Sequence, residues 1–184
     1  MNQPAIQEYF DIVDEENNLT GEVRLRSDAH ALDLWHRNVP IYCFYKKDGH
    51  YYFLVHLRSK TKDLYPNSWD THFGGHVKTG ETVEQTAVSE LKEEIGLGVN
   101  FADLIAGPIF KNDKGDDKRF DYLFFYNGSL DIRHLRFQDH EVQEVNWRSE
   151  DEILNAFQTE KHLWTKGLKD FGFVLSELKK IDIV

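Results

Sequence analysis

The chain has 184 residues, a formal net charge of −10 and a single cysteine, Cys43. This length favours one domain with a sizeable core, the acidic balance argues against binding the phosphate backbone of long nucleic acids, and one cysteine excludes an internal disulfide framework. No apolar run approaches the about 18 residues of a membrane span, and the start carries no signal-peptide pattern, so we expect a cytoplasmic protein without membrane contact.

The first predicted elements are strands. Residues 8–13 and 22–25 flank a turn-rich segment, which predicts an N-terminal β-hairpin. Residues 39–45 and 51–57 are rich in aromatic and β-branched side chains and are separated by a segment containing Asp48-Gly49, a dipeptide typical of hairpin turns. We expect this second pair to be core strands.

A helix is predicted from about Glu81. At about 100° per residue, Glu90, Glu93 and Glu94 fall on one face, whereas an apolar stripe lies beside them and Gly96 suits the left-handed position after the helix end. The stripe contains Ala87, Val88, Leu91 and Ile95. Like charges so placed oppose the helix by about 0.2–0.5 kcal/mol per pair, but converging carboxylates suit Mg²⁺ or Mn²⁺. The alternative is a solvated acidic face.

The remaining chain predicts further strands and helices. Apolar segments at residues 104–110, 120–126 and 142–147 read as strands. Residues 150–157 and about 164–180 have the pattern of helices.

The stretch from Gly75 to Leu97 resembles the Nudix hydrolase signature. Eight of its nine fixed positions match, and the mismatch is Ser89, where that family usually has an Arg that helps to hold the acidic cluster. The matching residues are Gly75, Glu81, Glu90, Leu91, Glu93, Glu94, Gly96 and Leu97.

The Nudix resemblance implies an α+β fold, an α/β/α sandwich with a mixed central sheet. We expect a single domain over residues 1–184, with an N-terminal hairpin and short helix at 1–37, the Nudix core at 38–158 and a C-terminal helical extension at 159–184. It also implies that the loop and helix bind a divalent metal and a diphosphate linkage.

Residues from about Tyr9 to Phe157 also resemble the Nudix branch that includes isopentenyl-diphosphate isomerases. His30, His36 and His76 match its metal-binding histidines in order and approximate spacing, and Asp121 falls where the isomerases carry an acidic metal and proton-transfer residue. By chemistry alone, such a set suits Mn²⁺, Zn²⁺ or Mg²⁺. The alternative is that each histidine makes only surface or turn hydrogen bonds.

The isomerase chemistry itself is disfavoured by a missing thiol. Those enzymes need a cysteine just before the Gly-His pair, and here that position is Gly74. Cys43 lies in an apolar strand pattern, which favours buried packing over a nucleophile.

Basic and acidic residues outside the signature complete the expected site. The resemblance implies that Arg58 and Lys62 approach the substrate phosphates together with Gly75, although an exposed basic loop is the alternative. An extra acidic residue often helps to activate water in Nudix hydrolases. Glu141 is our candidate, in competition with Glu144 and Asp121.

The leading hypothesis is a Nudix hydrolase. It would cleave a diphosphate linkage in a small molecule, such as a nucleoside diphosphate derivative, by attack of water assisted by Mg²⁺ or Mn²⁺. An isomerase-like enzyme and a non-catalytic ligand-binding module are the alternatives. The sequence leaves the substrate and the oligomeric state open, with a homodimer as one candidate.

Overall fold

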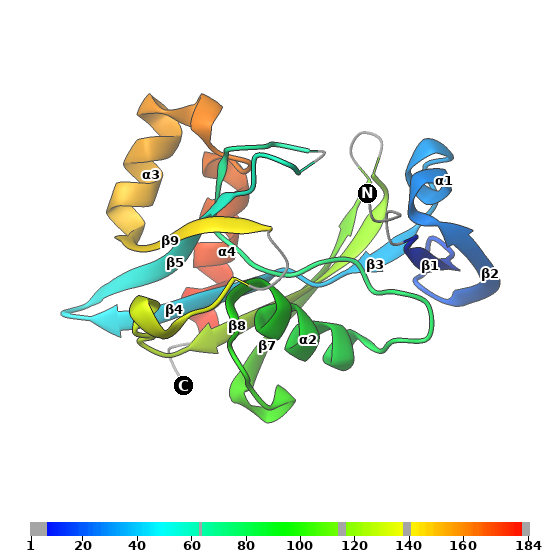
Figure 1. The fold of residues 1–184 in the computed structure, drawn as a ribbon, viewed down its shortest axis with the longest axis horizontal. Coiled ribbons are helices and arrows are strands. Elements are labelled where there is room, and N and C mark those ends of the chain that lie inside the picture. The colour runs from blue at the N-terminus through cyan, green and yellow to red at the C-terminus, as the bar shows by residue number, and fades with distance from the viewer. Residues whose placement is uncertain (1–6, 63, 114–116, 138–140, 182–184) are drawn as a thin grey trace, which may run out of the picture.

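A computed structural model describes residues 7–62, 64–113, 117–137 and 141–181 of the chain (Figure 1). A seven-stranded mixed sheet forms the centre, and the helices α2 (Val83–Ile95) and α3 (Glu150–Thr159) lie on opposite sides of it. This arrangement confirms the predicted α+β Nudix fold. In the described part of the chain, no helix is long and apolar enough to cross a membrane.

The N-terminal elements form a small unit at one end of the molecule (Figure 1). The strands β1 (Tyr9–Val13) and β2 (Leu19–Leu25) pair antiparallel, which confirms the predicted hairpin, and the short helix α1 (Arg26–Ala31) follows. Phe10 of β1 is fully buried with Ala29 of α1. This contact fixes α1 beside the next strand.

The main sheet has the strand order β3-β8-β4-β5-β6, with β7 paired to β8 and β9 to β5. The strands β3 and β4 run parallel to β8, and the other pairs are antiparallel. Asp48 and Gly49 both have positive φ angles, of 51° and 82°, as the predicted β4–β5 turn requires. The bounds are β3 His36–Asn38, β4 Ile41–Lys47, β5 His50–Arg58, β6 Trp69–Asp70, β7 Leu104–Asn112, β8 Arg119–Asn127 and β9 Val142–Ser149.

The helix α2 (Val83–Ile95) covers one face of the sheet and confirms the predicted helix. The Thr82 side chain accepts a hydrogen bond from the Gln85 backbone N–H and so begins it, and Gly96 ends it at φ 69°. Leu91 and Ile95 are fully buried, in one cluster with alternate residues of β4. Burying such a side chain stabilises the fold by about 1.5–3 kcal/mol.

The opposite face is covered by α3 (Glu150–Thr159) and α4 (Leu168–Ile181). The prediction that the last helix begins at about 164 was wrong by four residues. Trp164 is extended, at φ −124° and ψ 143°, and forms a β-bridge with Trp69, which places its indole against Phe157. Short 3₁₀ turns occur at Phe101–Asp103, Ile132–His134 and Lys161–Leu163.

Candidate active site

All three glutamates lie on α2 as predicted, and Lys78 links Glu90 with Glu93. Glu90 and Glu94 are buried, whereas the Glu93 side chain is 51% exposed. The loop before the helix approaches them so closely that a Cβ built on Gly75 would lie 2.9 Å from Glu90 Oε1. The glycine at position 75 therefore allows the backbone of the loop to reach the carboxylate cluster.

Lys78 supplies the cation that this cluster lacks at position 89. Its Nζ lies 3.9 Å from both Glu90 Oε1 and Glu93 Oε2. Ser89 instead donates a hydrogen bond from Oγ to the backbone oxygen of Thr86, 3.2 Å away in its own helix. The sequence pattern gave Lys78 little weight, because nothing in its spacing shows that it faces the glutamates.

The electrostatics of Glu90 suit a divalent cation. Burial raises its pKa to about 7, the Lys78 ammonium opposes the rise, and the charges of Glu93 and Glu141 add to it. A cation bound by the cluster would replace the water that burial removes and cancel the repulsion between the carboxylates. The residues present therefore fit the Mg²⁺ or Mn²⁺ expected from the sequence.

The two basic residues predicted to bind phosphate, Arg58 and Lys62, each face a carboxylate. Lys62 pairs with Glu141, and Arg58 NH1 lies 4.0 Å from Asp70 Oδ2, while its NH2 donates to the Leu64 backbone oxygen at 3.0 Å. The charge of Glu141 adds to the rise in the pKa of Glu90.

The histidines predicted as metal ligands do converge. One ligand atom from each of His30, His36, His76 and Asp117 lies within 4.8 Å of the others. The four residues come from α1, β3, the loop before α2 and the segment before β8. Phe10 stacks on the His36 and His76 rings, with ring centroids 5.0 and 4.8 Å apart. The fold thus assembles this cluster from segments that are distant in sequence.

The histidine cluster has the properties of a ligand set. The Nε2 atoms of His36 and His30 lie 3.2 and 3.7 Å from Asp117 Oδ1, and these atoms and His76 Nε2 are buried. Burial lowers the pKa of all three histidines, that of His30 to about 4. Neutral imidazoles beside a carboxylate suit Zn²⁺ or Mn²⁺.

The carboxylate of this cluster differs from the expected one. Asp121 lies away from the group and binds Arg119 Nε at 2.8 Å and Asn38 Nδ2 at 2.7 Å. Asp117 takes its place, because the segment before β8 rather than the strand itself faces the histidines. Arg119 also pairs with Asp117 and so connects the two carboxylates. The sequence spacing alone could not distinguish Asp117 from Asp121.

The backbone leaves no room for the cysteine side chain that isomerase chemistry would need. Gly74 has φ 116°, and a Cβ built on it would lie 1.9 Å from the Val39 backbone oxygen, so no side chain fits. Cys43 is fully buried, and burial raises the pKa of its thiol well above the ordinary value.

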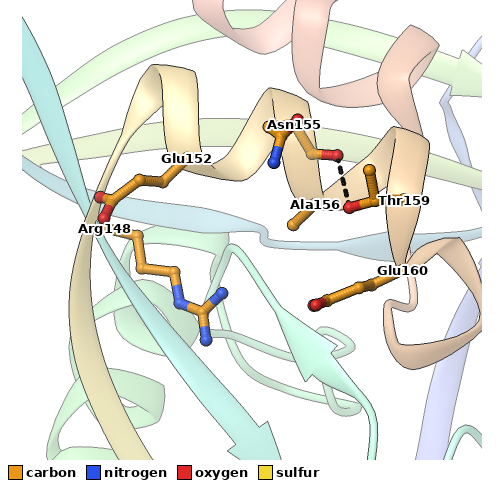
Figure 2. Close-up of a pocket in the computed structure, with 6 residues that line it drawn as sticks. All are labelled: Arg148, Glu152, Asn155, Ala156, Thr159 and Glu160. Carbon is orange, nitrogen blue, oxygen red and sulfur yellow. Dashed lines mark hydrogen bonds between the residues drawn. The ribbon is translucent and has the colours of Figure 1, made fainter.

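A shallow pocket of about 220 Å³ lies against α3 (Figure 2). Arg148 reaches into it, with its guanidinium carbon 4.9 Å from the Trp69 ring centroid and 5.5 Å from that of Trp164. None of the predicted site residues lines it. The lining residues are Arg148, Glu152, Asn155, Ala156, Thr159 and Glu160.

The family model and the related proteins agree on one family. The model of the NUDIX domain matches residues 34–167. An uncharacterized Nudix hydrolase of Clostridium acetobutylicum is 34% identical over 141 residues, covering 74% of this chain and 67% of that protein. The uncharacterized Nudix hydrolase YfcD of Escherichia coli is 33% identical over 150 residues, covering 81% and 78%.

Solved structures share the same fold. The protein DR0079 of Deinococcus radiodurans superposes with a TM-score of 0.65 at 23% identity, covering 83% of this chain and 90% of that one. The NUDIX domain of Shewanella oneidensis NrtR, solved with ADP ribose, superposes with a TM-score of 0.57 at 13% identity, covering 80% and 88%.

Proposed function

This chain belongs to the NUDIX domain family, and we propose that it hydrolyses the diphosphate linkage of a small nucleoside diphosphate derivative with a divalent cation. The observation that carries the proposal is the buried Glu90 against the close-approaching Gly75, with Glu93 joined to it through Lys78 and Glu94 on the same helix. Carboxylates on one helix edge repel one another by about 0.2–0.5 kcal/mol per pair, and a bound divalent cation would remove this repulsion.

Each group at this site has a role that follows from its position. Glu90, Glu93 and Glu94 hold Mg²⁺ or Mn²⁺, while Lys78 orients the first two carboxylates. The bound cation supplies the charge that polarises a phosphoryl oxygen and acidifies water. One of the glutamates, or Glu141, takes the proton from the attacking water.

Arg58 and Lys62 are the proposed phosphate ligands. Both already face carboxylates, Asp70 and Glu141, and the charge of Glu141 adds to the rise in the pKa of Glu90. A substrate phosphate would compete with Glu141 for Lys62, which frees Glu141 to act on water. Charge-assisted contacts of this kind position an anion and stabilise the charge that develops on it.

We assign a second cation to His30, His36, His76 and Asp117. The buried, converging ligand atoms of this cluster support the assignment, and their nitrogen-rich chemistry favours Zn²⁺ or Mn²⁺ over Mg²⁺. The two sites therefore differ in the metal they select.

The second candidate function is an isomerase-like reaction on an allylic or homoallylic diphosphate, which the histidine cluster favours. Proton transfer at carbon needs groups on both faces of the substrate, and the position expected for the thiol, Gly74, admits no side chain. Hydrolysis needs no such group. A binding module without turnover is the remaining alternative.

The test is phosphate or nucleotide release from a panel of nucleoside diphosphate derivatives and prenyl diphosphates, with Mg²⁺ and with Mn²⁺. ADP-ribose is a suitable first member, because the related NrtR domain was solved with it. Release that disappears in Glu94→Gln supports the hydrolase. Proton exchange into substrate carbon without release indicates the isomerase-like reaction, and ligand binding without any product indicates the binding module.

A further inference from the structure

The shallow pocket against α3 places a positive charge opposite a negative one (Figure 2). The guanidinium of Arg148, from β9, and the carboxylate of Glu160, the residue after α3, point toward one another across it. Within the described part of the chain, neither side chain forms an ion pair. The pocket therefore separates two opposite charges, and a ligand between them could contact both.

Two tryptophan rings hold the Arg148 guanidinium in place. Its central carbon lies 4.9 Å from the Trp69 ring centroid and 5.5 Å from that of Trp164, distances at which cation–π attraction acts. Trp164 is itself buried and is fixed by its β-bridge with Trp69. A stacked guanidinium keeps its N–H donors at the edge of its plane, where they can bind a carboxylate. The rings thus orient Arg148 without neutralising its charge.

The other side of the pocket suits one cationic group. Glu152 also lines the pocket, but its carboxylate accepts hydrogen bonds from the Ser149 N–H at 2.7 Å and from Ser149 Oγ at 2.9 Å. This capping box directs Glu152 to the start of α3. Glu160 lies at the opposite end of the helix, where the negative end of the helix dipole adds to its charge. An ammonium group would therefore be favoured at Glu160.

The dimensions of the pocket restrict the ligand. Its volume of about 220 Å³ is below the about 300–1,000 Å³ of typical ligand sites. The buried Ala156 supplies a small apolar wall, and Asn155 supplies a polar one. A small molecule with one carboxylate, one ammonium group and a short side chain matches this combination of size and charge.

We propose that this pocket binds a small α-amino acid as its zwitterion, with the carboxylate at Arg148 and the ammonium group at Glu160. None of the α2 glutamates or the clustered histidines lines the pocket, so the proposal goes beyond diphosphate hydrolysis and needs neither turnover nor a metal. Since a zwitterion carries no net charge, the protein's net charge of −10 does not repel it. Selectivity depends on the placement of both charged groups.

The test is calorimetric titration of the full chain with glycine, alanine and serine in EDTA, beside tryptophan fluorescence, which reports on the rings that hold Arg148. We expect saturable binding and a fluorescence change with the same midpoint. Acetate and methylammonium each carry only one of the two charges, so each should bind at least about tenfold more weakly than glycine.

Variants identify the two charged contacts. Arg148→Gln should weaken glycine binding about tenfold, because charge-assisted hydrogen bonds to the carboxylate are lost. Glu160→Gln, at an exposed position that leaves the core intact, should weaken it about threefold. Circular dichroism checks that both variants are folded.

The controls separate this pocket from the rest of the molecule. Glu144→Gln and Lys180→Gln, both exposed and outside the pocket, should bind glycine as the wild type does. Glu94→Gln should also bind glycine equally well, even if the hydrolase proposal fails. The proposal would be overturned by absence of saturable binding, by acetate or methylammonium binding as tightly as glycine, or by unchanged glycine affinity in Glu160→Gln and folded Arg148→Gln.

Discussion

The two groups of side chains that we propose bind metal ions differ in how the chain assembles them. The glutamates of α2 come from five consecutive residues of one helix, whereas His30, His36, His76 and Asp117 come from four separate segments. The first cluster offers only oxygen and has Lys78 as its neighbour; the second offers mostly neutral nitrogen. Local helical geometry is sufficient for the first, but the second depends on the whole fold.

The largest effect is expected from Glu93→Gln. Removing a direct metal ligand should reduce Mg²⁺-dependent turnover by at least about 100-fold, since even residues that only orient ligands contribute about 10–100-fold. Glu93 is half exposed, so the circular dichroism spectrum should stay unchanged. Glu84→Gln, at an exposed position in the same helix, is the control. Equal turnover in the two variants would place the chemistry elsewhere.

The histidine cluster should respond to a different metal. His30→Gln should weaken binding of Zn²⁺ by about 10–100-fold in calorimetric titration, because one of its nitrogen ligands is lost. His50→Gln, which keeps the cluster, should bind as the wild type does. Zn²⁺ affinity that falls in Glu93→Gln but not in His30→Gln would reverse our assignment of the two sites.

The two clusters also predict opposite effects of pH on stability. The pKa of His30 is lowered from 6.5 to about 4, so the unfolded chain binds extra protons between these values and stability falls as pH drops. The pKa of Glu90 is raised from 4.5 to about 7, so the folded chain holds the extra proton and stability falls as pH rises through that window.

Urea unfolding in EDTA checks this difference. Relative to the wild type, His30→Gln should lose less stability on acidification, and Glu90→Gln should lose less as pH rises from 4.5 to about 7. Parallel stability curves for all three proteins would show that neither group titrates as its burial implies.

A smaller effect is expected from Lys78→Met. Lys78 opposes the rise in the pKa of Glu90, so its removal should leave more Glu90 protonated at neutral pH and reduce turnover about tenfold. The deficit should shrink at alkaline pH. Ser89→Arg in the Lys78→Met protein should restore turnover, because position 89 lies four residues before Glu93 on the same helix and can place a guanidinium beside its carboxylate. Full activity of Lys78→Met at neutral pH would contradict the role given to Lys78.

The smallest effect is expected at the start of α2. Thr82→Ala removes the side chain that accepts the Gln85 N–H, and it should lower the free energy of unfolding by about 1 kcal/mol. Denaturant titration measures this change. Zn²⁺ binding by the histidine cluster should be unaffected, and its loss would mean that the two sites are coupled.

The sequence predicted those helices and turns that are determined by residues close together in the chain. The capped helix α2 and its Gly96 terminus follow from spacing of 3.6 residues and from a glycine that tolerates positive φ. The β4–β5 hairpin follows from Asp48-Gly49. In the candidate site, the same rules placed Glu90, Glu93 and Glu94 on one helix.

The parts that the sequence missed depend on packing between distant segments. Asp117 rather than Asp121 faces the histidines because of where the chain enters β8. Trp164 delays the start of α4 because its backbone pairs with Trp69.

The most direct test of the hydrolase proposal is turnover of the best substrate of the panel in water enriched in oxygen-18, with Mg²⁺, for the wild type and Glu94→Gln. The account predicts that the wild type releases a phosphate product carrying the heavy oxygen and that Glu94→Gln releases none. Product without label, or equal labelled release by both proteins, would contradict water attack at the α2 carboxylate cluster.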